Sequence, residues 1–521
     1  MKNYFLTIFL FFLVGTCLAQ VVVYPAPAGV TALSKRFQVT VTQSGVTHSC
    51  TVYADTALTD SYSAAGRYSP IWGWEGGNVF HFANFSFAGT ATVTVTKFSS
   101  TATAAALRPN AFGLGTVTTT ASGSNRTVTF TLTKASYVSV EFNDDPTLKD
   151  ALMVFGDALE LPANVPSTTG AGVVLVKDSA SLRNIGASTI VYFQPGVYKI
   201  GNWIVPTTVK QVYIAGGAYI KGYMNRTLYS SAVTNTIKIN GRGILTADGY
   251  AWHYPAAATD LSSSHYDNLI SLQGGENCSI EGITMIKASG FNIIAWGFNT
   301  NISNVKINGF KYNNDGINMA QTGVVINNCF IRDNDDAIDA YASNVTISNC
   351  IWWQLQGAEI NLGGWKPANL SNYTISNCTV LHDKAAKSDA DCGFLSGNYV
   401  SPTTATGTIS NFTLTNLYFD TPVLRFIDIR ADRNNVNMAL QQAVWVVRDI
   451  HISNVYFNQP APTTYPLIYI HGYDSNHPLI DFTFTNVSVN KAPVLFIKYG
   501  FYIFCKINSK CRSSVFIINY I

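Results

Sequence analysis

Charged residues are scarce in this chain, and their scarcity limits what the protein can bind. Only 12% of the 521 residues are Asp, Glu, Lys or Arg, whereas 47% are hydrophobic, a balance that favours a large buried core over solvated tails. The net charge of +3 comes with no long basic run, so neither a nucleic acid nor an anionic membrane is expected as a partner. A neutral substrate fits this composition better, and no cofactor is expected.

Cysteine is also sparse, because nine cysteines in 521 residues do not make a dense disulfide framework and their spacing does not reveal their pairing. Residues 1–19 combine an early Lys, an apolar run and small residues near their end, which is typical of a cleaved secretory signal peptide. The apolar run is shorter than the ~20 residues of a bilayer span, which disfavours the alternative of an uncleaved anchor. We therefore expect a secreted, extracellular protein, and sequons such as Asn84-Phe-Ser suit a glycoprotein.

Residues 20–165 are rich in Thr, Val and Ser. Short alternating runs such as RFQVTVTQ, TATVTVTKF and RTVTFTLTK are separated by Gly, Asn, Ser or Asp. This pattern predicts an N-terminal antiparallel β-sandwich, which can serve either as a binding module or as a support.

Residues 166–495 contain an internal repeat that no convincing amphipathic helix interrupts. Strand-like segments such as NISNVKI, VINNCFI and TISNCIW carry an Asn that recurs every 21 to 39 residues. Its positions are Asn304, Asn328, Asn349, Asn377, Asn416, Asn454 and Asn486. The shorter periods fit one coil of a parallel β-helix, and the longer ones fit a coil with an inserted loop, with Asn amides pairing between coils and Ile, Val and Cys stacking inward. A leucine-rich solenoid is the rival, but its Leu-x-x-Leu-x-Leu core is missing.

The repeat places acidic residues on adjacent coils. Aligning NNDGIN with NDDAID and AEIN gives one inward column, at steps of 21 and 22 residues, formed by Ile317, Ile338 and Ile360. The same alignment sets Asp315 over Asp336 and Asn318 over Asp339, about 4.8 Å apart. Two carboxylates at this spacing raise at least one pKa. Asp335 can join them only if the chain bends, because neighbouring side chains of a strand point to opposite faces.

The clustered acids have a structural and a chemical interpretation. A single Asp in such a turn often bonds only to the local backbone, and clustered carboxylates can also bind Ca²⁺. A structural turn gains nothing from three like charges, and the nearest cation in the sequence is Arg332. We therefore favour glycoside hydrolysis. In that reaction one carboxylic acid protonates the leaving oxygen while carboxylates on the other side activate water. No metal is therefore expected.

The sequence resembles glycoside hydrolase family 49, the dextranases and isopullulanases. The resemblance is carried by VSVEFNDDPTLKDALMVFGDALE, VYFQPGVYKIG, GRGILTADGYAW, NNDGIN, NDDAIDAYASNVTISNCIWWQ and NLGGW. It implies an all-β protein, with an N-terminal β-sandwich followed by a right-handed parallel β-helix, and inverting endo-hydrolysis of α-glucans. It also implies that Asp335 is the general acid and that Asp336 and Asp315 hold the water. The polygalacturonase relatives share the three-Asp layout, but their Gly-His-Gly and Arg-Ile-Lys elements are missing here.

The leading functional expectation is therefore a secreted endo-glucanase that cleaves the α-1,6 links of dextran. Isopullulanase-like cleavage of α-1,4 links, or hydrolysis of another neutral polysaccharide, stays open because the choice of linkage resides in loops. An inactive carbohydrate-binding or matrix protein is the non-enzyme alternative, and the presence of all three acids argues against it. A monomer is expected.

Aromatic side chains near the acids are candidates for sugar binding, because flat rings suit sugar faces. These candidates are Tyr312, Trp353 and Trp365, with His382 one coil further on. In a chain with 13% aromatic residues such rings more often pack inside, and a lone His is more often structural. Residues 496–521 form an apolar, basic tail that departs from the repeat, and our hypothesis is that the codons after about Leu495 are not native to the gene.

Overall fold

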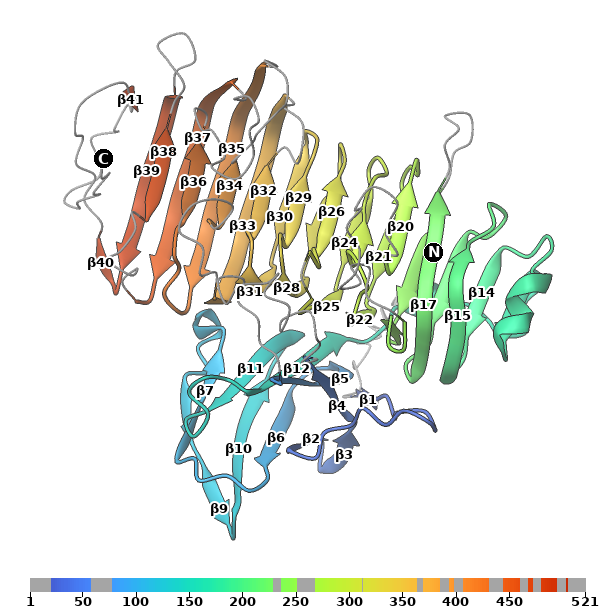
Figure 1. Cartoon of the computed structure of the whole chain (residues 1–521). Helices are drawn as coiled ribbons and strands as arrows, with labels where there is room; N and C mark the ends of the chain where they lie inside the picture. The colour runs from blue at the N-terminus through green and yellow to red at the C-terminus, as the bar shows by residue number, and fades with distance from the viewer. Residues whose placement is uncertain are drawn as a thin grey trace, which may run out of the picture.

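The structure is a computed structural model in which two β domains lie side by side (Figure 1). It describes residues 20–57, 77–227, 236–250, 268–311, 313–362, 369–384, 393–397, 406–430, 444–459, 467–471, 479–493 and 503–504. The predicted signal peptide at 1–19 and most of the tail at 496–521 lie outside these residues. Within the described ranges, no helix has both the length and the apolar character to cross a bilayer.

Two mainly antiparallel sheets form the N-terminal domain, as the alternating sequence predicted. One sheet has the order β1-β5-β12-β11-β7-β8 with β4 beside β5, and the other has the order β3-β2-β6-β10-β9. Val39 and Val41 of β2 and Val93 and Val95 of the neighbouring strand β6 face inward, and all four are fully buried between the sheets. The strands are β1 (Gln20–Val23), β2 (Phe37–Gln43), β3 (Val46–Cys50), β4 (Val52–Thr56), β5 (Val79–Ala88), β6 (Ala91–Lys97), β7 (Ala104–Arg108), β8 (Thr116–Thr118), β9 (Thr120–Ser122), β10 (Asn125–Leu132), β11 (Ser136–Phe142) and β12 (Asp150–Ala158), with 3₁₀ helices η2 (Asn110–Phe112) and η3 (Pro162–Asn164).

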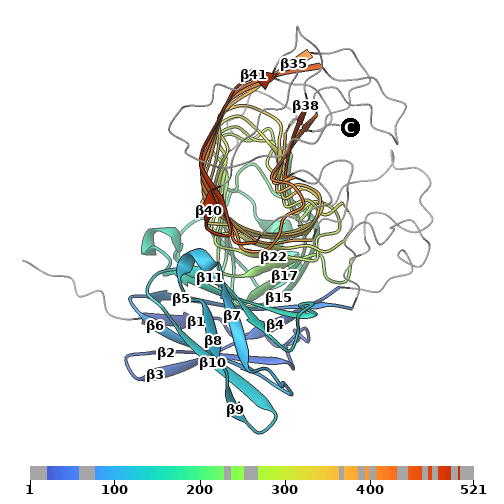
Figure 2. The same cartoon turned by 90° about the vertical axis from the view of Figure 1, so that its left-hand side faces the viewer.

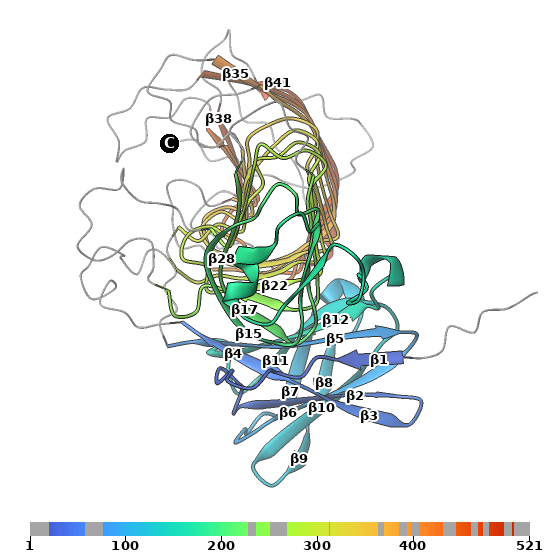
Figure 3. The ribbon, with the colours of Figure 1, turned by 90° about the vertical axis from the view of Figure 1, so that its right-hand side faces the viewer.

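The rest of the chain winds into a right-handed parallel β-helix, so the predicted fold class is confirmed. Viewed along its axis, the coils superimpose into a ring (Figures 2 and 3). Strands of successive coils pair in parallel and form three columns along the axis. The first column contains β13 (Val173–Val176), β14 (Ile190–Phe193), β16 (Gln211–Ile214), β18 (Lys238–Gly241), β21 (Ser279–Glu281), β24 (Asn301–Ser303), β27 (Val325–Asn327) and β30 (Val345–Ser348). The helix η4 (Ser179–Asn184) lies between β13 and β14.

The second and third columns complete each coil. The second contains β19 (Ile244–Thr246), β22 (Thr284–Ile286), β25 (Lys306–Asn308), β28 (Phe330–Asn334) and β31 (Ile351–Gln356). The third contains β20 (Ile270–Gln273), β23 (Ile293–Ile294), β26 (Ile317–Ala320), β29 (Ile338–Ala340), β32 (Ile360–Leu362), β34 (Leu395–Gly397), β36 (Ile427–Arg430) and β38 (Ile468–His471). Early strands β15 (Gly196–Ile204) and β17 (Ala218–Thr227) run through both of these columns.

In the later coils, single long strands run through the first and second columns. These are β33 (Leu370–Asp383), β35 (Thr406–Phe419), β37 (Val444–Phe457) and β39 (Leu479–Val489). Beyond them, β40 (Ala492–Pro493) turns back on β39, and β41 (Ile503–Phe504) pairs in parallel with the start of β39. A short piece of the tail therefore adds to the sheet.

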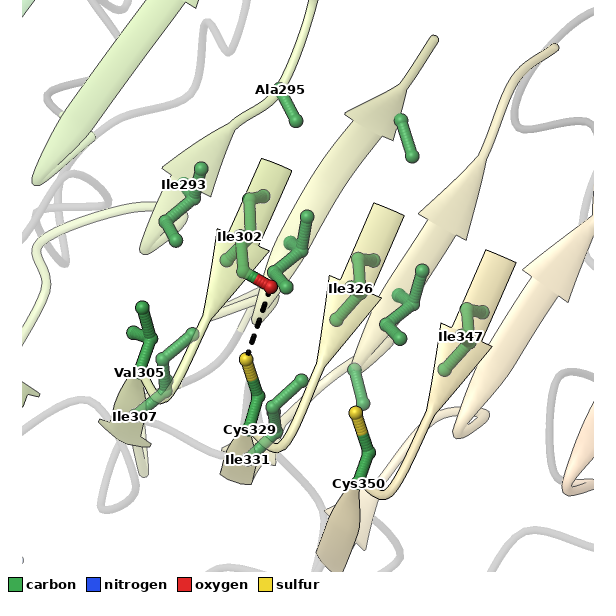
Figure 4. Close-up of a cluster of buried hydrophobic side chains, with 14 of the residues drawn as sticks. Ile293, Ala295, Ile302, Val305, Ile307, Ile326, Cys329, Ile331, Ile347 and Cys350 are labelled. Atoms are coloured by element: carbon green, nitrogen blue, oxygen red, sulfur yellow. Dashed lines mark hydrogen bonds between the residues drawn. The ribbon is translucent and has the colours of Figure 1, made fainter. Parts of the chain in front are cut away.

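Identical residue types stack in the core because each coil repeats the register of the previous one. Ile302 pairs with Ile326, which pairs with Ile347, and all three are fully buried (Figure 4). Cys329 and Cys350 lie at the adjacent turn, where the Cys329 thiol donates to the Ile302 carbonyl at 3.7 Å. The free buried cysteines among the described residues are Cys50, Cys278, Cys329, Cys350 and Cys378.

The recurring Asn fixes a turn and ties the coils together. All seven predicted positions have a positive φ between 52° and 56°, a conformation that Asn tolerates better than most side chains. The side-chain amides also stack, because Asn416 Nδ2 donates to Asn377 Oδ1 at 2.9 Å and Asn454 Nδ2 donates to Asn416 Oδ1 at 3.0 Å. The prediction of paired amides is confirmed at these coils.

The β-sandwich covers the outer face of the second column. Rings from both domains interleave there, among them Phe80, Phe82, Phe155, Tyr219, Phe330 and Trp353. Polar groups are buried in the same interface, where Lys306 Nζ donates to Asp157 Oδ2 at 2.6 Å and Asn308 Nδ2 donates to Asp55 Oδ2 at 2.6 Å. Burial lowers the pKa of Lys306, and its pairing with Asp157 opposes that shift.

Replacing Asn416 with Ala is expected to destabilise the β-helix by about 2 kcal/mol, because Ala is strained at positive φ and removes two rungs of the amide stack. Asn416→Gly loses the same rungs without the strain, so it should cost only about half as much. Thermal unfolding of the two variants measures the difference. Equal losses would show that the backbone conformation does not constrain this position.

Replacing Lys306 with Met is expected to cost about 3 kcal/mol, because it leaves the buried Asp157 carboxylate without its closest cation. Calorimetry should show a lower melting temperature and a separation of sandwich and β-helix transitions. The exposed Lys134→Met serves as the control. A Lys306→Met protein as stable as this control would contradict the role of the pair in joining the domains.

Candidate active site

The predicted acids meet where the second column turns into the third. Asp315 lies between β25 and β26, and Asp335 and Asp336 lie between β28 and β29 on the next coil. The backbone fixes their alignment, because the Gly316 amide donates to the Asp336 carbonyl at 3.1 Å and Ile317 pairs with Ile338. The predicted register between these two coils is therefore confirmed.

Asp315 is bound into a buried network. Its carboxyl accepts from the Asn318 side-chain amide, which also donates to Asp339 Oδ2 on the next coil at 2.7 Å. One amide thus holds two carboxyl groups close together. Burial raises the pKa of Asp315 well above its ordinary value, and the charges of Asp335, Asp339 and Asp336 raise it further.

Asp336 has two hydrogen-bond donors that support its anion. Its Oδ1 accepts from the Ala358 backbone amide at 2.8 Å, and its Oδ2 accepts from Asn361 Nδ2 at 2.7 Å. Burial nevertheless raises the pKa of Asp336 to about 7, with a further contribution from Asp335. Burial thus favours the protonated form of Asp315, whereas two donors support the anion of Asp336, and such a difference between neighbouring carboxyl groups suits acid–base chemistry.

The chain does bend at Asp335, as its participation in the cluster required. Strand β28 ends at Asn334, and its register with β31 shifts between Asp333 and Asn334. Gly357 on the following coil has φ +80° and approaches this bend so closely that an added Cβ would lie 2.7 Å from the Asp335 carbonyl oxygen. Asp335 is the partly exposed acid of its pair, whereas Asp336 is buried.

Two further acids lie beneath the bend, and the sequence reasoning assigned them no role. Asp333 and Glu359 are essentially inaccessible, and burial raises the pKa of both well above the ordinary range. Among the described residues, neither carboxyl oxygen of Asp333 has a hydrogen-bond partner. Asp333 has the same strand parity as the inward Ile331, a signal that would have placed it inside the coil. Burial thus opposes the ionisation of both acids.

The structure corrects two of the predicted sugar-binding residues. Trp353 is fully buried in the domain interface, where its ring lies near Phe80 and His382. His382 Nε2 lies 2.7 Å from Glu141 Oε1 of the sandwich. Both side chains point from the second column into the interface, so neither offers a face to a sugar. Tyr312 and Trp365 lie outside the described residues.

Arg332, the cation that lies nearest to the acids in the sequence, also contributes to the domain interface. Arg332 Nη1 donates to Asn308 Oδ1 at 2.9 Å, and its guanidinium lies over the rings of Phe80 and Trp353. It is thus directed away from the third column, on which Asp339 lies. The described residues contain no group of three or more His, Cys, Asp or Glu side chains arranged to hold a metal ion.

Known proteins match both the sequence and the fold. A family model described as "Glycosyl hydrolases family 28" matches residues 197–499. A dextranase of Arthrobacter sp. (strain CB-8) is 27% identical over 259 residues, which are 45% of this chain and 40% of that protein. An isopullulanase of Aspergillus niger is 27% identical over 315 residues, 54% of each chain. The matched regions thus span about half or less of these curated relatives.

Among solved structures, Dex49A from Penicillium minioluteum superimposes with a TM-score of 0.69 at 16% identity, covering 91% of this chain and 92% of that chain. At this identity the likeness concerns the fold. Together with the curated relatives, it confirms the resemblance to glycoside hydrolase family 49, the dextranases and isopullulanases, and the match to the family 28 model is consistent with this resemblance.

The raised pKa of Asp336 makes the folded protein less stable as the pH rises. The folded state keeps a proton that the unfolded chain releases above about pH 4, so stability is lost between about pH 4 and 7 and stays lost above that range. Asp336→Asn should therefore raise the melting temperature at pH 8 by about 2–5 °C and leave it nearly unchanged at pH 4. The control is Asp449→Asn, at a half-exposed site on β37. A variant that melts like the wild-type protein at both pH values would contradict a raised pKa of Asp336.

Proposed function

Because the chain belongs to glycosyl hydrolases family 28 and its matched relatives include dextranases and an isopullulanase, we propose that it is an endo-acting glycoside hydrolase of α-glucans. The α-1,6 links of dextran are the first candidate, and α-1,4 links, as in isopullulanase-like cleavage, are the second. The observation that carries the proposal is the meeting of Asp315, Asp335 and Asp336 on two stacked coils.

The reaction we propose divides the work between an acid and a base. Asp335, on the partly exposed bend, donates its proton to the glycosidic oxygen as the bond from that oxygen to the anomeric carbon breaks. A water molecule attacks the anomeric carbon from the opposite face and gives its proton to Asp336. The new hydroxyl therefore has the inverted configuration, and proton exchange with solvent restores both carboxyl groups.

The choice of Asp336 as the base follows from its hydrogen bonds. Two donors stabilise its anion, whereas the Asp315 carboxyl shares one amide with Asp339. Asp315 is thus the acid that retains its proton more strongly, and its role is to position the water. Desolvation strengthens both the stabilisation of the Asp336 anion by its donors and the retention of the proton by Asp315, because charges interact more strongly away from bulk water.

A binding protein without activity is the alternative class. It would keep the β-helix and bind a glucan but would not need acids such as Asp315 and Asp336, whose burial and repulsion by neighbouring carboxylates destabilise the fold. Such a cost is typical of catalytic sites. This consideration favours the enzyme.

Asp335→Asn is expected to lower kcat/KM by about 10²- to 10⁴-fold, because the amide has no proton to give to the leaving oxygen. Purified protein is incubated with dextran, pullulan, arabinan and polygalacturonate while reducing ends are followed, and NMR identifies the first product anomer. Asp449→Asn is the control for a change of charge elsewhere. Full activity of Asp335→Asn would refute the acid assignment, and retention of configuration would refute inversion. Failure of the wild-type protein on every polymer would favour the binding protein.

A further inference from the structure

Two exposed aromatic side chains lie on the coil that precedes Asp315. Trp296 is 48% exposed and Phe298 is 53% exposed, at the end of the third-column strand β23. Isolated exposed aromatic residues are common on protein surfaces. Here two lie only two residues apart on the same coil, and both are exposed.

The turn that carries these rings is firmly held by its neighbours. The Trp296 carbonyl accepts from the Gly274 amide at 2.9 Å, and the Phe298 amide donates to the Gly275 carbonyl at 2.9 Å. Gly297 between them packs so closely that an added Cβ would lie 3.0 Å from the Gly275 carbonyl oxygen. A ring on a fixed backbone loses little conformational entropy when it binds a ligand.

The register places Trp296 beside the acid cluster. Ile294 pairs with Asn318, the residue whose amide joins Asp315 to Asp339. Ala295 points into the core (Figure 4), so the next side chain, Trp296, points outward on the face that carries Asn318. Two residues along a strand and one coil across separate the Cα atoms of Trp296 and Asn318 by about 8 Å. That separation is on the scale of one or two sugar rings.

We propose that Trp296 is a stacking platform for a glucosyl unit of the α-glucan, on the N-terminal side of the acid cluster, and that Phe298 extends it away from the cleaved bond. The proposal rests on the proposed function. The C–H groups of a glucose ring form an apolar face that packs on an indole, and neither partner carries a charge. The ring would thereby hold the chain one or two units from the bond that Asp335 protonates.

Trp296 lies closer to the acids than Phe298 does. Trp296 is two residues beyond Ile294, whereas Phe298 is four residues beyond it and bridges to Glu276 on the preceding coil. Phe298 is thus further from the reacting bond and contacts only longer chains. A short oligosaccharide should depend on Trp296 alone.

The test compares Trp296→Ala, Trp296→Phe and Phe298→Ala with the control Phe112→Ala, which removes a ring that is 38% exposed on the sandwich. Trp296→Ala should raise KM for dextran about 3- to 10-fold, the range expected from one aromatic contact, with a smaller effect on kcat. Trp296→Phe should recover most of the loss. Phe298→Ala should raise KM for long dextran but not for short oligosaccharides. Unchanged KM in a Trp296→Ala protein with wild-type melting temperature would overturn the proposal.

A binding measurement separates this proposal from the proposed function. Native gels containing dextran are run with Asp335→Asn and with Asp335→Asn/Trp296→Ala, so that no hydrolysis is needed. Retardation of the first protein and not of the second would support the platform even if the wild-type protein cleaved no polymer. Equal mobility of both proteins would overturn it, whether or not the wild-type protein is active.

Discussion

The structure depends on one constraint, the in-register stacking of parallel coils. Neighbouring strands lie about 4.8 Å apart, so residues 21 to 24 positions apart in the sequence become lateral neighbours. In the core this produces columns of identical side chains such as Ile302, Ile326 and Ile347, which bury apolar area on every coil. Outside the apolar core, the same stacking brings Asp315 against the loop that carries Asp335 and Asp336. A register strong enough to hold the core is therefore strong enough to force like charges together.

The stacked apolar core beneath the acids explains how a chain with so few charges can hold a cluster of acids. Carboxylates repel one another in a buried site, and each would relax away from the others on a mobile loop. Here Asn318 bridges Asp315 and Asp339, while Asn361 and the Ala358 amide hold Asp336. The neutral amides satisfy carboxyl oxygens without neutralising them. The cluster thus keeps raised pKa values, and the apolar columns beneath it supply the stability that the repulsion removes.

The sequence was sufficient for everything that follows from periodicity. The Asn positions, the inward Ile column and the alignment of Asp315 with Asp336 all depend on a repeat that can be counted, and the structure has each of them. Trp353 and His382 were misplaced for a different reason. A repeat shows that a side chain points outward, but it does not show which of the three outer faces the sandwich covers. Asp333 was overlooked because an acid on an inward position contradicts the ordinary pattern of the core.

Asn314 and Asp335 show that the same position of the repeat is supported in two different ways. The two residues occupy equivalent positions on successive coils. Asn314 is 1% exposed, and its amide donates to the Gly290 carbonyl of the preceding coil, so its side chain is used to build the turn. The bend at Asp335 is supported instead by other parts of the chain, since Gln354 donates to its backbone carbonyl and Gly357 packs against it. Gln354 and Gly357 thus hold the backbone of the bend, and the function we propose uses the carboxyl group of Asp335 to transfer a proton.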